Sequence, residues 1–323
     1  MKSIVGLGRA LVDACINDED IIPILKLLIG PIEQGHNHFL LDDDQAKYIL
    51  SRLKTENFIA GGSVANTLRY CSRNGKPSVF VGTIGNDELG SLFLSELERD
   101  GVNLQVQRTD KMTGFTLFCE FPRIGSKISL FYYGASDTPF SVDSIEGLLG
   151  SDAILHSSAY NFVSPLDRSV IDIYLRAQEK GSFRSVNISG YAKQNLRPKM
   201  NALRSLLDQN ILNLITGNSS EFLAVVGRNE LNDESLELIG NLASMVLMTM
   251  AEEGSIYFEN KGYKTIHPYN DVKFPVYVVG AGDAYTSGII QGLMDGKPFF
   301  ESCLGGSKLA YLKCREVHER STR

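Results

Sequence analysis

The sequence predicts an α/β protein with a doubly wound, mainly parallel central sheet that is flanked by helices and carries a small β-sheet lid. From residue 152 onward, apolar segments typical of buried strands alternate with segments typical of helices, which indicates a parallel sheet. Residues 104–133 contain closely spaced strand segments joined by turns, which indicates a separate small sheet. The 323 residues contain no repeat and no long linker, so we expect one domain over residues 1–323.

The first half of the chain begins with an apolar strand that ends at glycines, and Asp13 follows it after a short turn. Parts of about residues 14–60 and 104–133 are expected to form the lid. The elements expected before residue 152 are strands at Ser3–Gly8, Phe39–Leu41, Ser78–Val81, Leu104–Val106, Phe115–Phe121 and Ile128–Tyr133, and helices at Asp20–Leu28 and Asp43–Leu53.

The second half of the chain has the strand–helix alternation that predicts the parallel sheet. An antiparallel strand pair is expected near its end, followed by two helices that close the domain. The expected elements are strands at Ala153–His156, Ser182–Asn187, Ile211–Thr216, Met245–Thr249, Gly254–Glu259 and Lys261–His267, and helices at Pro165–Lys180, Pro198–Gln209, Asp283–Met294 and Phe299–Glu319.

Composition excludes several classes of function. A net charge of −6 without a Lys/Arg cluster argues against a nucleic-acid partner, although a local site can still bind an anionic nucleotide. The longest apolar run, residues 21–29, is interrupted by Pro23 and Lys26 and is too short to span a bilayer, so no membrane partner is expected. Five scattered cysteines without a C-x-x-C pair are typical of free thiols in a reducing compartment, and we expect a cytoplasmic protein.

The strongest candidate site is the glycine turn at Gly280-Ala281-Gly282-Asp283, which opens a helix. Its peptide N–H groups can point into one concavity, and the positive end of the helix adds to the attraction for an anion. A carboxylate beside such an anion hole can take a proton while the hole stabilises a negatively charged transition state. The alternative is an ordinary turn in which Asp283 is a cap or first-turn acid.

Other candidate residues follow the predicted strands or open helices. Asn218 and Glu221 are three residues apart at a helix start and could hold a hydrated Mg²⁺, although a helix capping box explains the same pair. Asn66 lies one turn into a helix opened by Gly61 and Gly62, whose small size also fits close packing of a helix on a sheet. In a doubly wound sheet, ligands bind at the carboxyl ends of the strands, where we expect Asp13, Thr216–Glu221, Thr249–Gly254 and the Gly280 turn to converge.

These motifs together resemble the PfkB (ribokinase-like) family of carbohydrate and nucleoside kinases over essentially the whole chain. The matching segments are Gly61-Gly-Ser-Val-Ala-Asn66, Gly82-x-x-Gly-x-Asp87-x-x-Gly90, Thr216-x-Asn218-x-x-Glu221 and Gly280-Ala-Gly-Asp283. The resemblance is nearest to the adenosine-kinase-like and general sugar-kinase branches, and less close to the phosphofructokinases. It implies ATP-dependent phosphorylation of a primary hydroxyl of a sugar or nucleoside, with Mg²⁺.

The resemblance also implies a role for each matching residue. Asp283 would be the general base, and the backbone of Gly280, Ala281 and Gly282 would form the anion hole. The remaining roles are sugar or nucleoside binding by Asp13, Gly62 and Asn66, nucleotide binding by Asn187, Asn218, Gly254 and Gly306, and Mg²⁺ binding, through water, by Asn218 and Glu221.

The sequence departs from the family pattern at three places. Tyr277 and Val278 stand where an Asp-Thr pair is common, which makes activation by a monovalent cation doubtful. Ala251 stands where the family usually has a glycine, and its methyl group is expected to narrow the site on the side of the nucleotide phosphates. Asn187 is followed by Ile-Ser rather than by a basic residue, so altered nucleotide contacts are expected.

The sequence permits some alternatives to a kinase of this family and excludes others. A catalytically silent nucleotide- or sugar-binding protein on the same scaffold remains one. A P-loop kinase is excluded because no G-x-x-x-x-G-K-[ST] is present, and a dinucleotide-dependent oxidoreductase lacks its complete glycine fingerprint. A homodimer could form through an open edge of the lid sheet, which the sequence does not decide.

Overall fold

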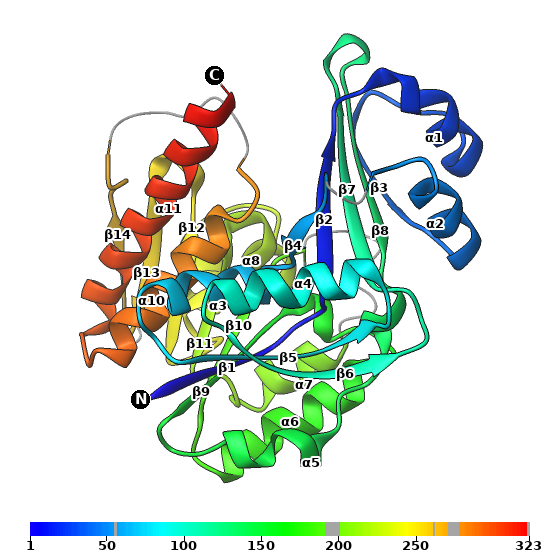
Figure 1. The fold of residues 1–323 in the computed structure, drawn as a ribbon. Helices are drawn as coiled ribbons and strands as arrows, with labels where there is room; N and C mark the ends of the chain where they lie inside the picture. The colour runs from blue at the N-terminus through cyan, green and yellow to red at the C-terminus, as the bar shows by residue number, and fades with distance from the viewer. Residues whose placement is uncertain (55–56, 191–200, 261, 271–277, 322–323) are drawn as a thin grey trace.

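The computed structural model describes residues 1–54, 57–190, 201–260, 262–270 and 278–321. Two β-sheets organise these residues, a large one that spans the body of the molecule and a small one that stands beside it (Figure 1). None of the described helices is long and apolar enough to cross a bilayer.

In the described residues the large sheet has nine strands, and the first seven from one edge are parallel. The other two strands continue it as an antiparallel pair, as the sequence predicts. In spatial order the strands are β6 (Asn103–Thr109), β5 (Ser78–Gly85), β1 (Ser3–Leu7), β9 (Ala153–Ser158), β10 (Phe183–Asn187), β11 (Leu214–Asn218), β12 (Met245–Thr249), β13 (Ser255–Glu259) and β14 (Gly262–Ile266).

Helices cover both faces of this sheet, because successive residues of a strand point to opposite sides. In β9, for example, Leu155 packs into the core on one side and Ile154 into the core on the other. The helices on the Leu155 side are α5 (Val142–Ile145), α6 (Asp167–Glu179), α7 (Asn201–Asp208), α8 (Ser219–Val226) and α9 (Asp233–Gly240). Those on the opposite side are α3 (Ser63–Arg73), α4 (Glu88–Arg99), α10 (Ala281–Met294) and α11 (Phe299–Ser321). The doubly wound fold is therefore confirmed.

The small sheet is built from strands that the sequence predicts only in part. Its spatial order is β3 (Gly35–Leu40), β8 (Ser126–Tyr132), β7 (Gly114–Phe121), β2 (Leu11–Ile16) and β4 (Ile59–Gly61). Helices α1 (Ile22–Ile29) and α2 (Asp43–Leu50) cover the outer face, and the other face looks across the body toward α10 and α11 (Figure 1).

One detail of the predicted lid is wrong. Residues 104–109 belong to β6, which pairs in parallel with β5 at the edge of the large sheet, because β5, α4 and β6 form one strand–helix–strand unit. Asp13, which was expected after the first strand and its turn, lies within β2 of the small sheet.

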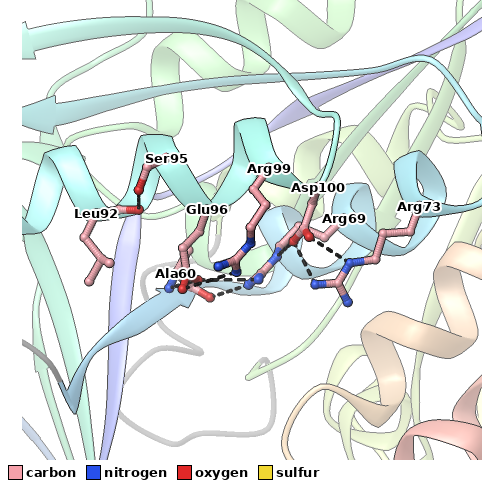
Figure 2. Close-up of polar contacts among 8 residues, drawn as sticks. All are labelled: Ala60, Arg69, Arg73, Leu92, Ser95, Glu96, Arg99 and Asp100. Atoms are coloured by element: carbon pink, nitrogen blue, oxygen red, sulfur yellow. Dashed lines mark hydrogen bonds and ion pairs between the residues drawn. The ribbon is translucent and has the colours of Figure 1, made fainter.

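A network of buried charges joins the edge strand β4 to the body (Figure 2). The Arg69 guanidinium donates to the Ala60 carbonyl at 2.7 Å, and the Ala60 N–H donates to Glu96 at 2.8 Å. Arg69 also pairs with Glu96 and Asp100, and Arg73 donates two hydrogen bonds of 2.9 Å to Asp100. Both backbone groups of Ala60 that face away from β2 are thus occupied by side chains. A homodimer through the small sheet stays a prediction, and the β3 edge is the better place for it.

Candidate active site

The Gly280 turn brings the predicted carboxylate to the start of α10. Gly280 has a φ of 86°, a left-handed conformation that favours glycine, and Asp283 lies in the first helical turn with 7% of its surface exposed. A Cβ built on Gly282 meets no atom within 4 Å, so the space beside this turn is open. Ala281 donates to the Val278 carbonyl at 3.3 Å, whereas a helix offers no acceptor to the N–H groups of its first turn.

Two side chains from the start of α3 hold the Asp283 carboxylate. The Ser63 hydroxyl donates to Oδ1 at 2.6 Å, and the Asn66 amide donates to Oδ2 at 3.2 Å. Burial raises the pKa of Asp283 from 3.8 to about 6, although these hydrogen bonds and the charge of Lys313 lower it. A carboxyl with this pKa is ionised at neutral pH and can still accept a proton during a reaction.

Asp13 approaches the same place from the small sheet. It lies opposite Ile59 of β4 and Thr116 of β7, and burial raises its pKa to about 7. Hydrogen bonds from Thr116 and the Gly62 backbone oppose this rise, and the negative charge of Asp283 adds to it. A Cβ built on Gly61 would lie 2.0 Å from Oδ2 of Asp13, so any larger residue at Gly61 would displace the Asp13 carboxylate. The structure therefore brings Asp13, Gly62, Asn66 and Asp283 together.

A second group of predicted residues joins the first through α10. The buried Asn187 amide donates to the Thr286 hydroxyl at 3.4 Å, and Thr286 also contacts the Thr216 hydroxyl at 2.9 Å. Because Thr286 follows Asp283 by three residues, Asn187 lies beside the first turns of α10.

Asn218 and Glu221 form a capping box at the start of α8, as the alternative interpretation predicts. Asn218 accepts from the Glu221 N–H at 3.0 Å, and Glu221 accepts from the Asn218 N–H at 2.9 Å. The second Glu221 oxygen accepts from the Gly190 N–H at 2.9 Å. A role in binding Mg²⁺ or nucleotide stays a prediction for this pair.

The structure explains the two remaining predicted glycines by packing. A Cβ on Gly254 would lie 2.2 Å from the Ile266 carbonyl, and one on Gly306 would lie 2.5 Å from the Tyr285 ring. Gly306 thus lets α11 approach α10 closely, and Gly254 permits the tight turn into β13. Their roles in nucleotide binding stay predictions.

Comparison with known proteins identifies the family. The profile described as pfkB family carbohydrate kinase matches residues 36–322. The chain belongs to the PfkB family of carbohydrate kinases. It is similar to an ATP-dependent 6-phosphofructokinase of Thermoanaerobacterium thermosaccharolyticum, with 22% identity over 302 residues that cover 92% of this chain and 88% of the relative. It is 26% identical over 250 residues to fructokinase-2 of Solanum lycopersicum, which covers 75% of this chain and 74% of the relative.

The fold also resembles solved structures of kinases. An adenosine kinase from Sinorhizobium meliloti superposes with a TM-score of 0.79 at 21% identity, covering 96% of this chain and 92% of the other. The expected resemblance to adenosine kinases and sugar kinases is confirmed, and a phosphofructokinase is among the relatives. PfkB membership implies ATP as the phosphoryl donor.

Two departures from the PfkB pattern can be compared with the structure. Ala251 has a φ of 50°, the left-handed conformation that suits the glycine usual at this position. Val278 is buried and accepts the Ala281 N–H, so it supports the glycine turn. Tyr277 lies outside the described residues.

Replacing Ala251 with glycine is expected to raise the free energy of unfolding by about 0.5–1 kcal/mol, because the left-handed strain exceeds the entropic cost of glycine. Urea unfolding of both proteins measures the difference. The matched control is Ala224→Gly within α8, where the same change is expected to cost about 1 kcal/mol. A destabilised Ala251→Gly variant would contradict the strain.

Sequence reasoning missed three residues of this PfkB site. Ser63 was part of the Gly-Gly-Ser-Val-Ala-Asn segment but was given no role, although a hydroxyl opening a helix beside Asp283 was a usable signal. Thr116 lies beside Asp13 on the same face of the small sheet. Only the register between β2 and β7 reveals this. Lys313 arrives from α11 and had no local signal at all.

Proposed function

We propose that this protein transfers the γ-phosphoryl group of ATP to a primary hydroxyl of a sugar or nucleoside, with Asp283 as the general base. The observation that carries this proposal is the Asp283 carboxylate, buried at the open glycine turn and held by Ser63 and Asn66. Family membership supports ATP-dependent phosphorylation in general.

The reaction follows from the position of the carboxylate. The acceptor hydroxyl gives its proton to Asp283 as its oxygen forms a bond to the γ-phosphorus. The bond between the γ-phosphorus and the bridging oxygen breaks, and ADP leaves with the electron pair. The N–H groups of Gly280 and Gly282 and the positive end of α10 stabilise the charge on the transferred group, whereas the Ala281 N–H donates to the Val278 carbonyl.

Asp13, Gly62 and Asn66 bind the hydroxyls of the acceptor in this proposal. Asp13 and Gly62 belong to the strand and turn at which the small sheet meets α3. The small sheet acts as a lid, since its inner face looks toward α10 and would exclude the water that competes as an acceptor (Figure 1). Asn187, Asn218, Gly254 and Gly306 lie on the nucleotide side.

The residues fit a hydrated Mg²⁺ rather than a directly bound one. In the described part of the chain, no group of three or more His, Cys, Asp or Glu side chains could ligate a metal. Each Glu221 oxygen accepts one backbone N–H, and because a carboxylate oxygen offers more than one lone pair it can also accept a hydrogen bond from the water shell of the ion. Mg²⁺ keeps much of its water shell in proteins, and when bound with ATP it neutralises phosphate charge.

The pH dependence of kcat/KM tests the roles of the two carboxyls. Burial raises the pKa of Asp283 to about 6 and the pKa of Asp13 to about 7. In the proposed roles, ionised Asp283 accepts the proton of the attacking hydroxyl, and ionised Asp13 accepts a hydrogen bond from a hydroxyl of the acceptor. We therefore expect kcat/KM to fall as the pH decreases from 8 to 5, with the two groups titrating as a coupled pair. Asp13→Asn should remove the upper step and keep the lower one. A flat profile down to pH 5 would contradict both assignments.

The function is tested by measuring ADP release from Mg²⁺-ATP with a panel of acceptors. The panel contains adenosine, inosine, ribose, fructose, fructose 6-phosphate and 2-keto-3-deoxygluconate. Turnover with one compound, lost in Asp283→Asn, is the expected result. A wild-type protein that binds ATP but turns over none of these compounds would favour the silent binding protein, and one that does not bind ATP would overturn the proposal.

A further inference from the structure

A lysine from the last helix reaches the glycine turn. Helix α11 runs back along α10, and Gly306 sets the close contact between them by packing against Tyr285 and Gly288. Lys313 is seven residues after Gly306, two turns further along the same face of α11. It therefore arrives at the N-terminal end of α10.

Lys313 lies on the same side of the glycine turn as Asn66 and Asp283. A Cβ built on Gly280 lies 3.8 Å from Cε of Lys313, 3.9 Å from the Asn66 amide nitrogen and 3.9 Å from Oδ2 of Asp283. Lys313 and the Asp283 carboxylate thus both border the space beside Gly280. The positive charge of Lys313 acts on the Asp283 carboxyl, whose pKa it lowers.

Lys313 is half-buried and makes no hydrogen bond or ion pair with the residues that the structure describes. The cations that extend from the neighbouring helix α3 are occupied, because Arg69 and Arg73 both pair with Asp100. The Lys313 side chain is long and flexible and lies beside the predicted anion hole. Its ammonium is therefore available to an anionic ligand.

We propose that Lys313 is a further catalytic residue, whose ammonium contacts the phosphoryl group as it passes from ATP to the acceptor beside Asp283. This inference rests on the proposed function and adds to it a charged side chain opposite the backbone N–H groups of the glycine turn. The phosphoryl group carries negative charge on its equatorial oxygens, so a cation placed there stabilises the transition state. Lys313 moves no proton, because Asp283 takes the hydroxyl proton.

The test compares Lys313→Met, Lys313→Arg and wild type on the acceptor that gives turnover. Methionine keeps the apolar stem but removes the charge, so kcat is expected to fall about 100-fold with little change in the KM of the acceptor. Lys313→Arg keeps the charge, so we expect it to retain most of the activity that Lys313→Met loses. The matched control is Lys308→Met, which removes an exposed lysine from the same helix and should leave kcat unchanged.

Binding of a phosphoryl mimic gives an independent measurement by calorimetry. With Mg²⁺, ADP and aluminium fluoride, Lys313→Met should bind the fluoride complex much more weakly than wild type, and ADP alone equally well. Equal kcat and equal fluoride affinity in Lys313→Met and wild type would overturn the inference and leave the proposed function intact. A wild-type protein with neither turnover nor nucleotide binding would overturn the proposed function, and this inference with it.

Discussion

Replacing Asp283 with asparagine is expected to lower kcat by about three orders of magnitude, because the amide cannot accept the proton of the attacking hydroxyl. Asparagine has nearly the same shape and keeps a carbonyl oxygen that can accept the hydrogen bond from Ser63. The KM values for ATP and for the acceptor should therefore change little. Steady-state kinetics on the acceptor identified by the panel measure both quantities.

The same substitution is expected to stabilise the fold at pH 8. Burial raises the pKa of Asp283 from 3.8 to about 6, so folding favours the protonated carboxyl. The stability that this proton contributes is fully present below pH 3.8 and is lost as the pH rises through about 6, a loss on the order of 3 kcal/mol. Asp283→Asn removes this pH dependence between pH 4 and 6, which urea unfolding can follow.

The combination of results distinguishes chemistry from folding. Asp295→Asn, at the other end of α10, is the matched control and should keep full activity. An inactive Asp283→Asn protein that is also destabilised at pH 8 would mean that the carboxylate supports the fold. Activity that survives in Asp283→Asn would sink the mechanism.

The glycine turn was predictable because its signal is local. Glycine at Gly280 and Gly282 before an apolar helix indicates a turn with exposed N–H groups, and the structure has that turn and the left-handed Gly280. The same holds for Asn66, one turn into a helix that glycines open. For Asn218 and Glu221, the local pattern fits both a capping box and a metal site, and the structure shows the capping box.

The strand that carries Asp13 was not predictable in the same way. Asp is disfavoured in strands, so no strand was expected over Leu11–Ile16, although its other side chains alternate. Asp13 is tolerated there because the strand turns it away from the apolar core of the small sheet and toward Asp283. Asp13, for which we propose a role in binding the acceptor, is thus the residue that hides the strand pattern.

Pairing between distant segments was the other source of error. Residues 104–109 have the alternation of a strand, but alternation does not name the partner strand. The helix between Ser78–Gly85 and this segment was the missing clue, since a strand–helix–strand unit predicts parallel pairing. Lys313 depends on the close contact of α10 and α11 at Gly306, which no pattern within α11 reveals.

Replacing Arg69 with methionine is expected to lower the free energy of unfolding by about 2–3 kcal/mol, because it removes a partner from two buried carboxylates. Among the described residues, Asp100 then pairs only with Arg73, and Glu96 only with the exposed Arg99. Arg69, Glu96 and Asp100 have side chains that are 13%, 12% and 7% exposed (Figure 2). Burial raises the pKa of Asp100, but hydrogen bonds and positive charge from Arg69 and Arg73 outweigh burial and hold this pKa below 3.8. Urea unfolding at pH 7 measures the loss.

The matched control is Arg99→Met. Arg99 contacts the same Glu96 at 3.5 Å, but its side chain is 66% exposed, so solvent screens the pair and the expected loss is below about 0.5 kcal/mol. Arg69→Lys keeps the charge without the planar fork and should fall between the two. Equal stability of Arg69→Met and Arg99→Met would show that the network contributes nothing beyond a surface pair.

The network also links stability to the proposed site. Arg69 and Glu96 fix both backbone groups of Ala60, and the next residues along the chain are Gly61, which leaves room for Asp13, and Gly62, whose N–H bonds to it. Loosening β4 therefore displaces the acceptor subsite more than the phosphoryl subsite, because Asp283 and the glycine turn belong to α10. At a temperature where Arg69→Met is still folded, we expect the KM of the acceptor to rise more than kcat falls. A fall in kcat at constant KM would instead place the effect of Arg69 on α3, through Ser63 and Asn66.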